Sequence, residues 1–186
     1  MTAWLAKGPA QDTPAGGTLM LVAMAGLPGT GKSALAARLA AALGGVVIGK
    51  DEVRAALFPG AALDYSPEQD DVAMQAVYAA AVHLRRTRPG LAVFLDGRTF
   101  SKARQVATLL ALGEPVRVIE CVCPPDVARA RIAAERGHLA GNRTPELHDR
   151  SRANAEPLTV PRLTLDTAAL TPDECERRAL AYLAGR

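Results

Sequence analysis

One segment near the start of the chain constrains its fold more than any other feature. It matches the pattern G-x-x-x-x-G-K-[S/T] and reads Gly26-Leu27-Pro28-Gly29-Thr30-Gly31-Lys32-Ser33. At average residue frequencies, a chance match in a chain of this length has a probability well under about one in a hundred. The apolar run Leu19–Ala25 before it predicts a buried strand, and the helical spacing of Ser33–Leu43 after it predicts a helix ended by Gly44. A glycine-rich loop between a strand and a helix is typical of phosphate binding.

The residue types of this loop explain that expectation. Glycine lets successive backbone N–H groups turn toward a phosphate without Cβ clashes, and the N-terminus of the following helix adds favourable charge. We expect Leu27 to Ser33 to hold the phosphates of ATP or GTP, with Lys32 neutralising the β- and γ-phosphates and Ser33 offering its hydroxyl to Mg²⁺. The alternative is a glycine-rich turn with an exposed lysine. Motors, switches, ATPases and kinases all use such a loop, so other residues must decide the reaction.

Strand and helix patterns alternate along the rest of the chain. Further strands are expected at 46–48, 91–95, 116–122 and 162–165, and further helices near 51–54, 66–88, 101–112 and 125–136. A short helix starting near Thr144-Pro145, with some loop, is expected within 137–160, and a last helix from 172 onward. Ser66-Pro67-Glu68-Gln69 and Thr171-Pro172-Asp173-Glu174 carry capping signals. The alternation predicts an α/β fold with a five-stranded parallel sheet. Residues 1–17 lack periodicity and are predicted to be a flexible segment before one domain spanning 18–186.

Candidate acceptor-side residues follow the second expected strand. Asp51 and Arg54 are three positions apart, so a helical turn places them on one face. Ligands bind at the carboxyl edge of open parallel sheets, where Asp51 can accept a proton from an attacking hydroxyl and Arg54 can bind an anionic group. The alternative is an N-capping Asp51 with Arg54 on the surface. Asp96, at the end of the third strand, is either a magnesium-associated carboxylate or a turn residue before Gly97.

The phosphate loop followed about twenty residues later by D-x-x-R resembles the small P-loop kinases, and in particular the kinase domain of polynucleotide 5′-hydroxyl kinases and their bacterial ATPase-like relatives. Zeta-type toxins, chloramphenicol phosphotransferase, gluconate kinase and adenylate-type kinases share that scaffold. The resemblance implies a three-layer P-loop NTPase fold with helices on both faces and a nucleoside-kinase-like arginine lid. It also implies that Asp51 is the general base, that Arg54 binds acceptor phosphate, and that Asp96 is a Walker B residue holding Mg²⁺ through water. Phe94-Leu95-Asp96-Gly97-Arg98 is similar to the adenylate-kinase D-G-F-P-R segment but lacks its phenylalanine and proline.

The lid that this resemblance implies falls on the helix after Pro125. Arg129 and Arg136 are two helical turns apart and share a face, whereas Arg131 points elsewhere. We therefore expect Arg129 and Arg136 to stabilise charge on the transferring phosphoryl group, with a solvated helix face as the alternative. Arg143, Arg150 and Arg152 are candidates for the same lid or for an acceptor groove. The three histidines lack metal-ligand spacing and are expected to be structural or surface residues.

Composition narrows the remaining possibilities. The net charge of +3 suits anionic ligands without establishing nucleic-acid binding. No apolar run approaches a membrane span, no signal peptide is apparent, and three cysteines give no disulfide framework, so a cytoplasmic protein without a clear protein partner is expected. Cys121 and Cys123 are expected to be buried thiols.

These features together predict a kinase that uses ATP and Mg²⁺ and transfers the γ-phosphoryl group to a hydroxyl acceptor. The acceptor is a nucleic acid 5′-hydroxyl or, alternatively, a sugar, metabolite or antibiotic. A nucleotide-binding switch or regulatory ATPase without an acceptor is the alternative from another class.

Overall fold

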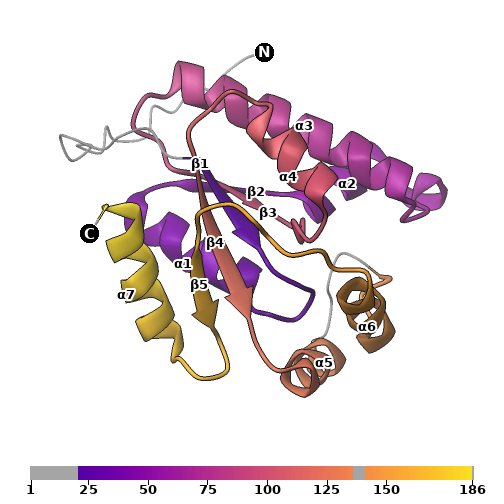
Figure 1. Cartoon of the computed structure of the whole chain (residues 1–186). Helices are drawn as coiled ribbons and strands as arrows, with labels where there is room; N and C mark the ends of the chain where they lie inside the picture. Colours follow the sequence, from indigo (N-terminus) through magenta and orange to yellow (C-terminus); the bar gives the residue numbers. More distant parts are fainter. Residues whose placement is uncertain (1–20, 136–140, 186) are drawn as a thin grey trace, which may run out of the picture.

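The fold is a parallel sheet between two layers of helices, as seen in a computed structural model that describes residues 21–135 and 141–185 (Figure 1). The expected flexible segment 1–17 lies outside the described residues. Five parallel strands pair in the order β2-β3-β1-β4-β5. They are β1 (Leu21–Ala25), β2 (Val46–Gly49), β3 (Val93–Asp96), β4 (Val116–Val122) and β5 (Leu163–Asp166). The α/β fold class and the five-stranded parallel sheet are thereby confirmed.

The helices follow the expected order along the chain. Within the described residues they are α1 (Lys32–Leu43), α2 (Lys50–Leu57), the 3₁₀ helix η1 (Gly60–Ala62), α3 (Pro67–Thr87), α4 (Ala103–Leu110), α5 (Pro125–Ala134), α6 (Pro145–Ala153) and α7 (Pro172–Leu183). Both capping signals act as expected: the Ser66 and Thr171 hydroxyls accept from the backbone N–H groups three residues later, at 3.2 Å each. The helix after Pro125 ends at Ala134, two residues earlier than expected.

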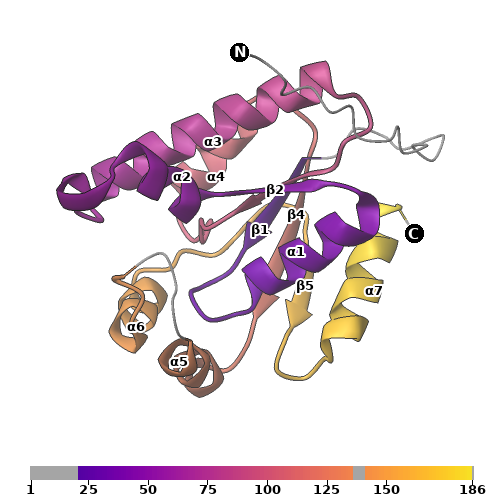
Figure 2. The same ribbon diagram turned by 180° about the vertical axis from the view of Figure 1, so that it is seen from behind.

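Alternation along β1 builds two cores, one on each face of the sheet. Val22 and Met24 pack with α1 and α7, while Leu21, Ala23 and Ala25 pack with α3 and α4. Figure 2 shows α1 and α7 together on one face, with α3 and α4 beyond the sheet. Since both faces of β1 are covered, all five of its residues are buried, as an apolar strand in a parallel sheet requires.

The thiols differ from expectation in one case. Cys121 is fully buried in β4, and burial raises the pKa of its thiol to about 12. Cys123, expected to be buried beside it, is only partly buried because β4 ends at Val122. Its Sγ lies 4.0 Å from the carbonyl oxygen of Gly29.

No helix in the described part of the chain is both long enough and apolar enough to cross a membrane.

Candidate active site

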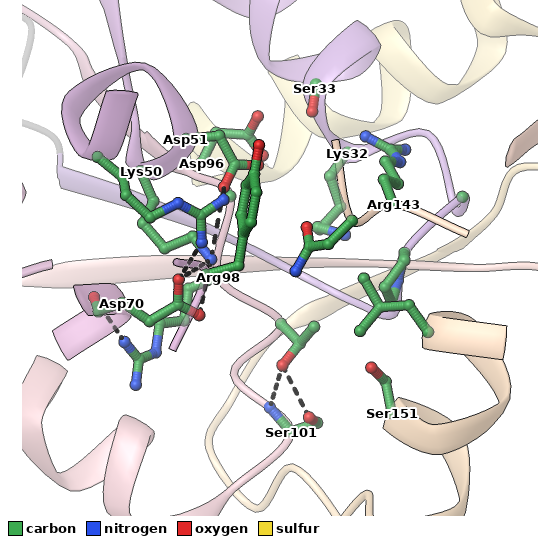
Figure 3. Close-up of a pocket in the computed structure, with 18 of the residues that line it drawn as sticks. Lys32, Ser33, Lys50, Asp51, Asp70, Asp96, Arg98, Ser101, Arg143 and Ser151 are labelled. Atoms are coloured by element: carbon green, nitrogen blue, oxygen red, sulfur yellow. Dashed lines mark hydrogen bonds and ion pairs between the residues drawn. The ribbon is translucent and has the colours of Figure 1, made fainter. Parts of the chain in front are cut away.

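The sheet order brings three separate segments to one edge. β3 lies between β1 and β2, and the register pairs Gly49 with Asp96. The phosphate loop after β1, Asp96 at the end of β3 and the start of α2 therefore meet at the carboxyl edge, where ligands bind in open parallel sheets. They line a cavity of about 890 Å³, of the size of small-molecule sites (Figure 3).

The phosphate loop has the close packing that its glycines permit. Gly29 has φ 81°, and a Cβ there would lie 2.6 Å from the carbonyl oxygen of Ala128 in α5. Gly26 has φ 128°, and a Cβ there would lie 2.2 Å from the carbonyl oxygen of Cys121 in β4. Any other residue would push the loop away from the sheet or from α5. Gly31 precedes α1, so the first backbone N–H groups of that helix are free to bind an anion.

Lys32 lies in this loop as a buried ammonium group. Its Nζ donates to the Leu27 carbonyl oxygen at 2.8 Å, within the loop itself. Burial lowers the pKa of Lys32 to about 8, and the nearby Asp96 carboxylate partly opposes that shift. Ser33, which follows it, is exposed to the cavity. The loop thus places a cation and a hydroxyl where a triphosphate and its metal would lie.

Asp96 is the buried carboxylate of the site. It is 7% exposed, and its Oδ1 has no hydrogen-bond partner among the residues that the structure describes. A buried carboxylate oxygen without a partner is costly, so it calls for a cation or water. Asp96 and Ser33 line the same cavity, and this donor set suits Mg²⁺, which keeps most of its waters and takes few protein ligands. The described residues include no group of three or more His, Cys, Asp or Glu that could hold a metal by themselves.

Asp51 belongs to a charged cluster on the acceptor side. Its Oδ1 accepts from Arg54 Nη2 at 2.7 Å and lies 3.5 Å from Lys50 Nζ. Asp70 of α3 completes the cluster by pairing with Arg54 and by accepting from Lys50 Nζ at 2.9 Å. Figure 3 shows Lys50, Asp51 and Asp70 together on one side of the cavity. Asp51 is therefore a cavity-lining carboxylate, and the N-cap of α2 is Gly49.

Arg54 lines the cavity beside Asp51, and its guanidinium is already paired with two carboxylates. Its side chain is buried at 3% exposed, between the two carboxylates and beneath the Tyr65 ring, whose centroid lies 4.7 Å away. In this arrangement its Nη2 contacts Asp51 Oδ1 at 2.7 Å. The binding of acceptor phosphate by Arg54 stays a prediction.

The arginines expected to form a lid are distributed over several surfaces. Arg129 Nη1 donates to Asp149 of α6 at 3.0 Å, and Arg129 is not among the residues that line the described cavity. Arg136 lies outside the described residues. Arg131, which the sequence analysis set aside, lines the cavity and donates to both oxygens of Thr167 at 2.8 Å. Thr167 in turn donates to the Thr30 carbonyl oxygen at 2.9 Å, so Arg131 is tied to the phosphate loop.

Two cavity-lining arginines were missed by sequence reasoning, and one histidine, expected to be structural or on the surface, contacts the phosphate loop. Arg98 is buried in the cavity wall and donates to Asp71 at 2.6 Å, and Arg104 donates to the same carboxylate at 3.2 Å. His148 of α6 is almost fully buried, with Nδ1 2.8 Å from the Pro28 carbonyl oxygen of the phosphate loop. Arg143 and Arg150 line the cavity, whereas Arg152 lines a separate smaller one. The faint likeness of Asp96-Gly97-Arg98 to the adenylate-kinase D-G-F-P-R segment was the one available signal, for Arg98.

Comparison with known proteins agrees with this fold. The family described as "AAA domain" matches residues 21–158. A gluconokinase from Sinorhizobium meliloti 1021 has a similar structure (TM-score 0.67, 18% identity, 90% of this chain and 93% of that chain covered). An APS kinase, CysC, from Mycobacterium tuberculosis, solved with AMPPNP and APS, is also similar (TM-score 0.62, 20% identity, 90% and 98% covered). So is Kti12 from Chaetomium thermophilum, solved with ADP-AlF3 (TM-score 0.64, 17% identity, 89% and 97% covered).

A search of curated protein sequences gives no match. The structural similarities, all at low identity, show a P-loop kinase-like fold.

Proposed function

This chain belongs to the AAA-domain family, and on that premise we propose that it transfers the γ-phosphoryl group of ATP to a hydroxyl acceptor. One observation carries the proposal: Asp51 lines the same cavity as Lys32, Ser33 and Asp96. A P-loop protein that only bound nucleotide would have no need for an oriented carboxylate beside the phosphate site. A carboxylate there is suited to receive the proton of an attacking hydroxyl.

In the proposed reaction, the acceptor oxygen attacks the γ-phosphorus and the bond between that phosphorus and the β,γ-bridging oxygen breaks. The acceptor proton passes to Asp51, and ADP leaves. Among the described residues, the ion pairs of Asp51 with Lys50 and Arg54 use Oδ1. Oδ2 is then the oxygen available to the acceptor. Arg54 and Lys50 hold the carboxylate in place through their contacts with Oδ1.

The transferring phosphoryl group carries spread negative charge in a loose transition state, so positioned cations supply most of the rate. Lys32 and Arg131 are the residues we assign to that task, since both line the cavity and both contact the phosphate loop or the residue bound to it. Ser33 and Asp96 would hold Mg²⁺, which when bound neutralises phosphate charge and orients the oxygens. Arg129 and Arg136 remain candidates from the sequence alone.

The acceptor is expected to carry an anionic group. Nine Lys and Arg side chains line the cavity against five Asp and Glu side chains, an excess of four cations that nucleotide phosphates would share with an anionic acceptor. On the acceptor side, Arg98 and Arg104 share the single carboxylate of Asp71. The similarity to a gluconokinase and an APS kinase is in keeping with a phosphotransferase whose acceptor is a small anion.

The test is the variant Asp51→Asn, compared with Asp173→Asn on the exposed surface of α7. We expect Asp51→Asn to lower kcat for transfer by about 10²- to 10⁴-fold, the usual contribution of a general base. The Kd for ATP should stay within about twofold, because among the described residues Asp51 pairs with Lys50 and Arg54 and forms no hydrogen bond or ion pair with the phosphate loop. Asp173→Asn should match the unchanged protein in both measurements. Unaltered transfer by Asp51→Asn would remove Asp51 from this role, and ATP turnover without any acceptor would favour a regulatory ATPase.

A further inference from the structure

The turn before α3 is held in a fixed shape by a side chain of that helix. Gln69 Nε2 donates to the Ala62 carbonyl oxygen at 2.6 Å, and its Oε1 accepts from the Asp64 N–H at 3.1 Å. Asp64 in turn accepts from the Ser66 N–H at 2.8 Å. Residues on both sides of Tyr65 are thus pinned. Tyr65 itself has φ 56°, a left-handed conformation that a bulky residue adopts only when its surroundings impose it.

In that conformation the Tyr65 ring contacts one side of the cavity and its hydroxyl contacts the other. Its ring covers the Arg54 guanidinium, which orients Asp51. Its hydroxyl accepts from the Gly141 N–H at 2.9 Å. Gly141 precedes the cavity-lining residues Asn142 and Arg143 on the α6 side. Tyr65 therefore bridges the acceptor side of the cavity and the segment that leads into α6.

This bridge is unsuited to a nucleic acid strand. Proteins that hold single strands stack successive bases on several aromatic rings. Among the described residues that line the cavity, Tyr65 is the one aromatic residue, and the face of its ring is already in contact with Arg54. A strand whose 5′ end reached Asp51 from this side would have to displace the contact between Tyr65 and Gly141.

Another cavity residue indicates a ligand with several polar groups. Gln105 of α4 lines the cavity, and its Oε1 is buried without a hydrogen-bond partner among the described residues. A buried amide oxygen of this kind calls for a donor, such as a second hydroxyl of the acceptor. Arg98, in the same cavity wall, shares its carboxylate partner with Arg104 and retains charge for an anion.

From these observations we propose that Tyr65 is a specificity-determining residue that restricts the acceptor to a low-molecular-weight hydroxylated anion. The inference rests on the proposed function and names the substrate class of that same site. The Tyr65 ring packs on Arg54, which pairs with Asp51, and its hydroxyl ties the segment leading into α6 to that side of the cavity. This arrangement would narrow the path to Asp51 for polymers and for bulk water.

The test uses the full chain with γ-labelled ATP and four separate acceptors: gluconate, glycerate, glycerol 3-phosphate and a 5′-hydroxyl decathymidylate. The variants are Tyr65→Phe, which removes only the hydroxyl, and Tyr182→Phe, the same change on α7, where the ring contacts Arg117 instead. The measured quantities are kcat and KM for each acceptor and the ratio of transfer to ATP hydrolysis by water.

We expect the unchanged protein to label a small acceptor and not the oligonucleotide. Tyr65→Phe should lower the ratio of transfer to hydrolysis by about threefold to tenfold, as the loss of one hydrogen bond and of water exclusion would do. Tyr182→Phe should leave that ratio unchanged, and a role limited to folding stability would leave it unchanged in Tyr65→Phe as well.

Two results would overturn the inference while leaving the proposed function intact. One is labelling of the oligonucleotide with a kcat/KM at least equal to that of the best small acceptor. The other is an unaltered ratio of transfer to hydrolysis in Tyr65→Phe with an active small acceptor. Labelling of no acceptor at all, with hydrolysis retained, would contradict the proposed function and the inference together.

Discussion

Lys32 illustrates how a single buried residue links nucleotide binding to pH. Desolvation lowers its pKa to about 8, because the ammonium group has few partners inside the loop beyond the Leu27 carbonyl oxygen. A bound polyphosphate would supply the missing negative charge and raise that pKa again. Since the bound state then holds the proton more tightly than the free state, binding above pH 8 must take up a proton.

We therefore predict that the Kd for ATP is nearly constant below pH 8 and rises above it. The slope should approach tenfold per pH unit, because one proton is taken up on binding. Isothermal titration calorimetry at pH 9, in two buffers with different ionisation enthalpies, measures that uptake directly. Equal apparent enthalpies in the two buffers at pH 9 would contradict the prediction.

Asp96 should shift this pH dependence in a defined direction. Its carboxylate raises the pKa of Lys32, so Asp96→Asn should lower that pKa further and move the rise in Kd to a pH below 8. The same variant should also raise the Mg²⁺ concentration needed for half-maximal activity, since it removes the carboxylate charge behind the metal's water shell. Titration of activity against Mg²⁺ concentration, beside the pH series, checks both effects. An unchanged pH dependence, or a shift toward higher pH, would contradict this action of Asp96 on Lys32.

At the residue level, sequence alone predicts the parts of the site that lie within a motif. The phosphate loop, Asp51 and Asp96 line one cavity, as their spacing along the chain suggests. Asp70 and Tyr65 were missed because their part in the site depends on how α3 packs against α2, and no local pattern encodes that contact. The pairing of Arg54 with Asp70 could not be predicted, because sequence gives no information about a carboxylate from another helix.

The packing of α5 against α6 and the phosphate loop determines which arginines face the cavity. Arg131 lies on the cavity side of α5, tied through Thr167 to the phosphate loop, whereas Arg129 faces Asp149 on α6. The prediction that Arg129 and Arg131 lie on different faces of this helix is confirmed. The sequence could not tell which of these faces points to the cavity, because that depends on where α5 packs on the loop at Gly29.

The two arginines give opposed expectations that one pair of variants can resolve. We predict that Arg131→Ala lowers kcat by about 10²-fold or more, the usual loss for a donor to transition-state charge. Arg129→Ala should change kcat by less than about threefold, because it loses only an exposed ion pair. Steady-state kinetics of both variants, at saturating ATP, measures the difference. The reverse ranking would restore Arg129 as the phosphate-binding residue.

Elements were predicted well where local chemistry marks their ends. The Ser66 and Thr171 caps fix the starts of α3 and α7, and β4 has the expected bounds Val116–Val122. The start of α4 at Ala103, two residues later than expected, is not marked by a side-chain cap. Such a boundary depends on tertiary contacts, here the Ala103 N–H donating to Glu156 at 2.6 Å.

At the scale of the whole molecule, the strand order decides which residues meet. β1 lies at the centre between β3 and β4, so segments separated by many residues in the chain share one edge. Alternating strand and helix patterns predict a parallel sheet but leave the order of its strands open. The contact of the phosphate loop with Ala128 of α5, and with His148 of α6, further joins that edge to the later part of the chain.

Nucleotide binding should therefore stabilise the fold as a whole and not the loop alone. A ligand at about 100 times its Kd adds about 2.7 kcal/mol to the free energy of unfolding, which for a domain of this size raises Tm by roughly 5–11 °C. We predict a shift in this range with ATP and Mg²⁺, measured by differential scanning calorimetry. EDTA should reduce the shift, and Lys32→Ala should abolish most of it because the central cation of the phosphate site is gone. Arg178→Ala, on the exposed face of α7, should retain the full shift. A shift that is equal in Lys32→Ala would mean that the nucleotide binds somewhere other than the loop from Gly26 to Ser33.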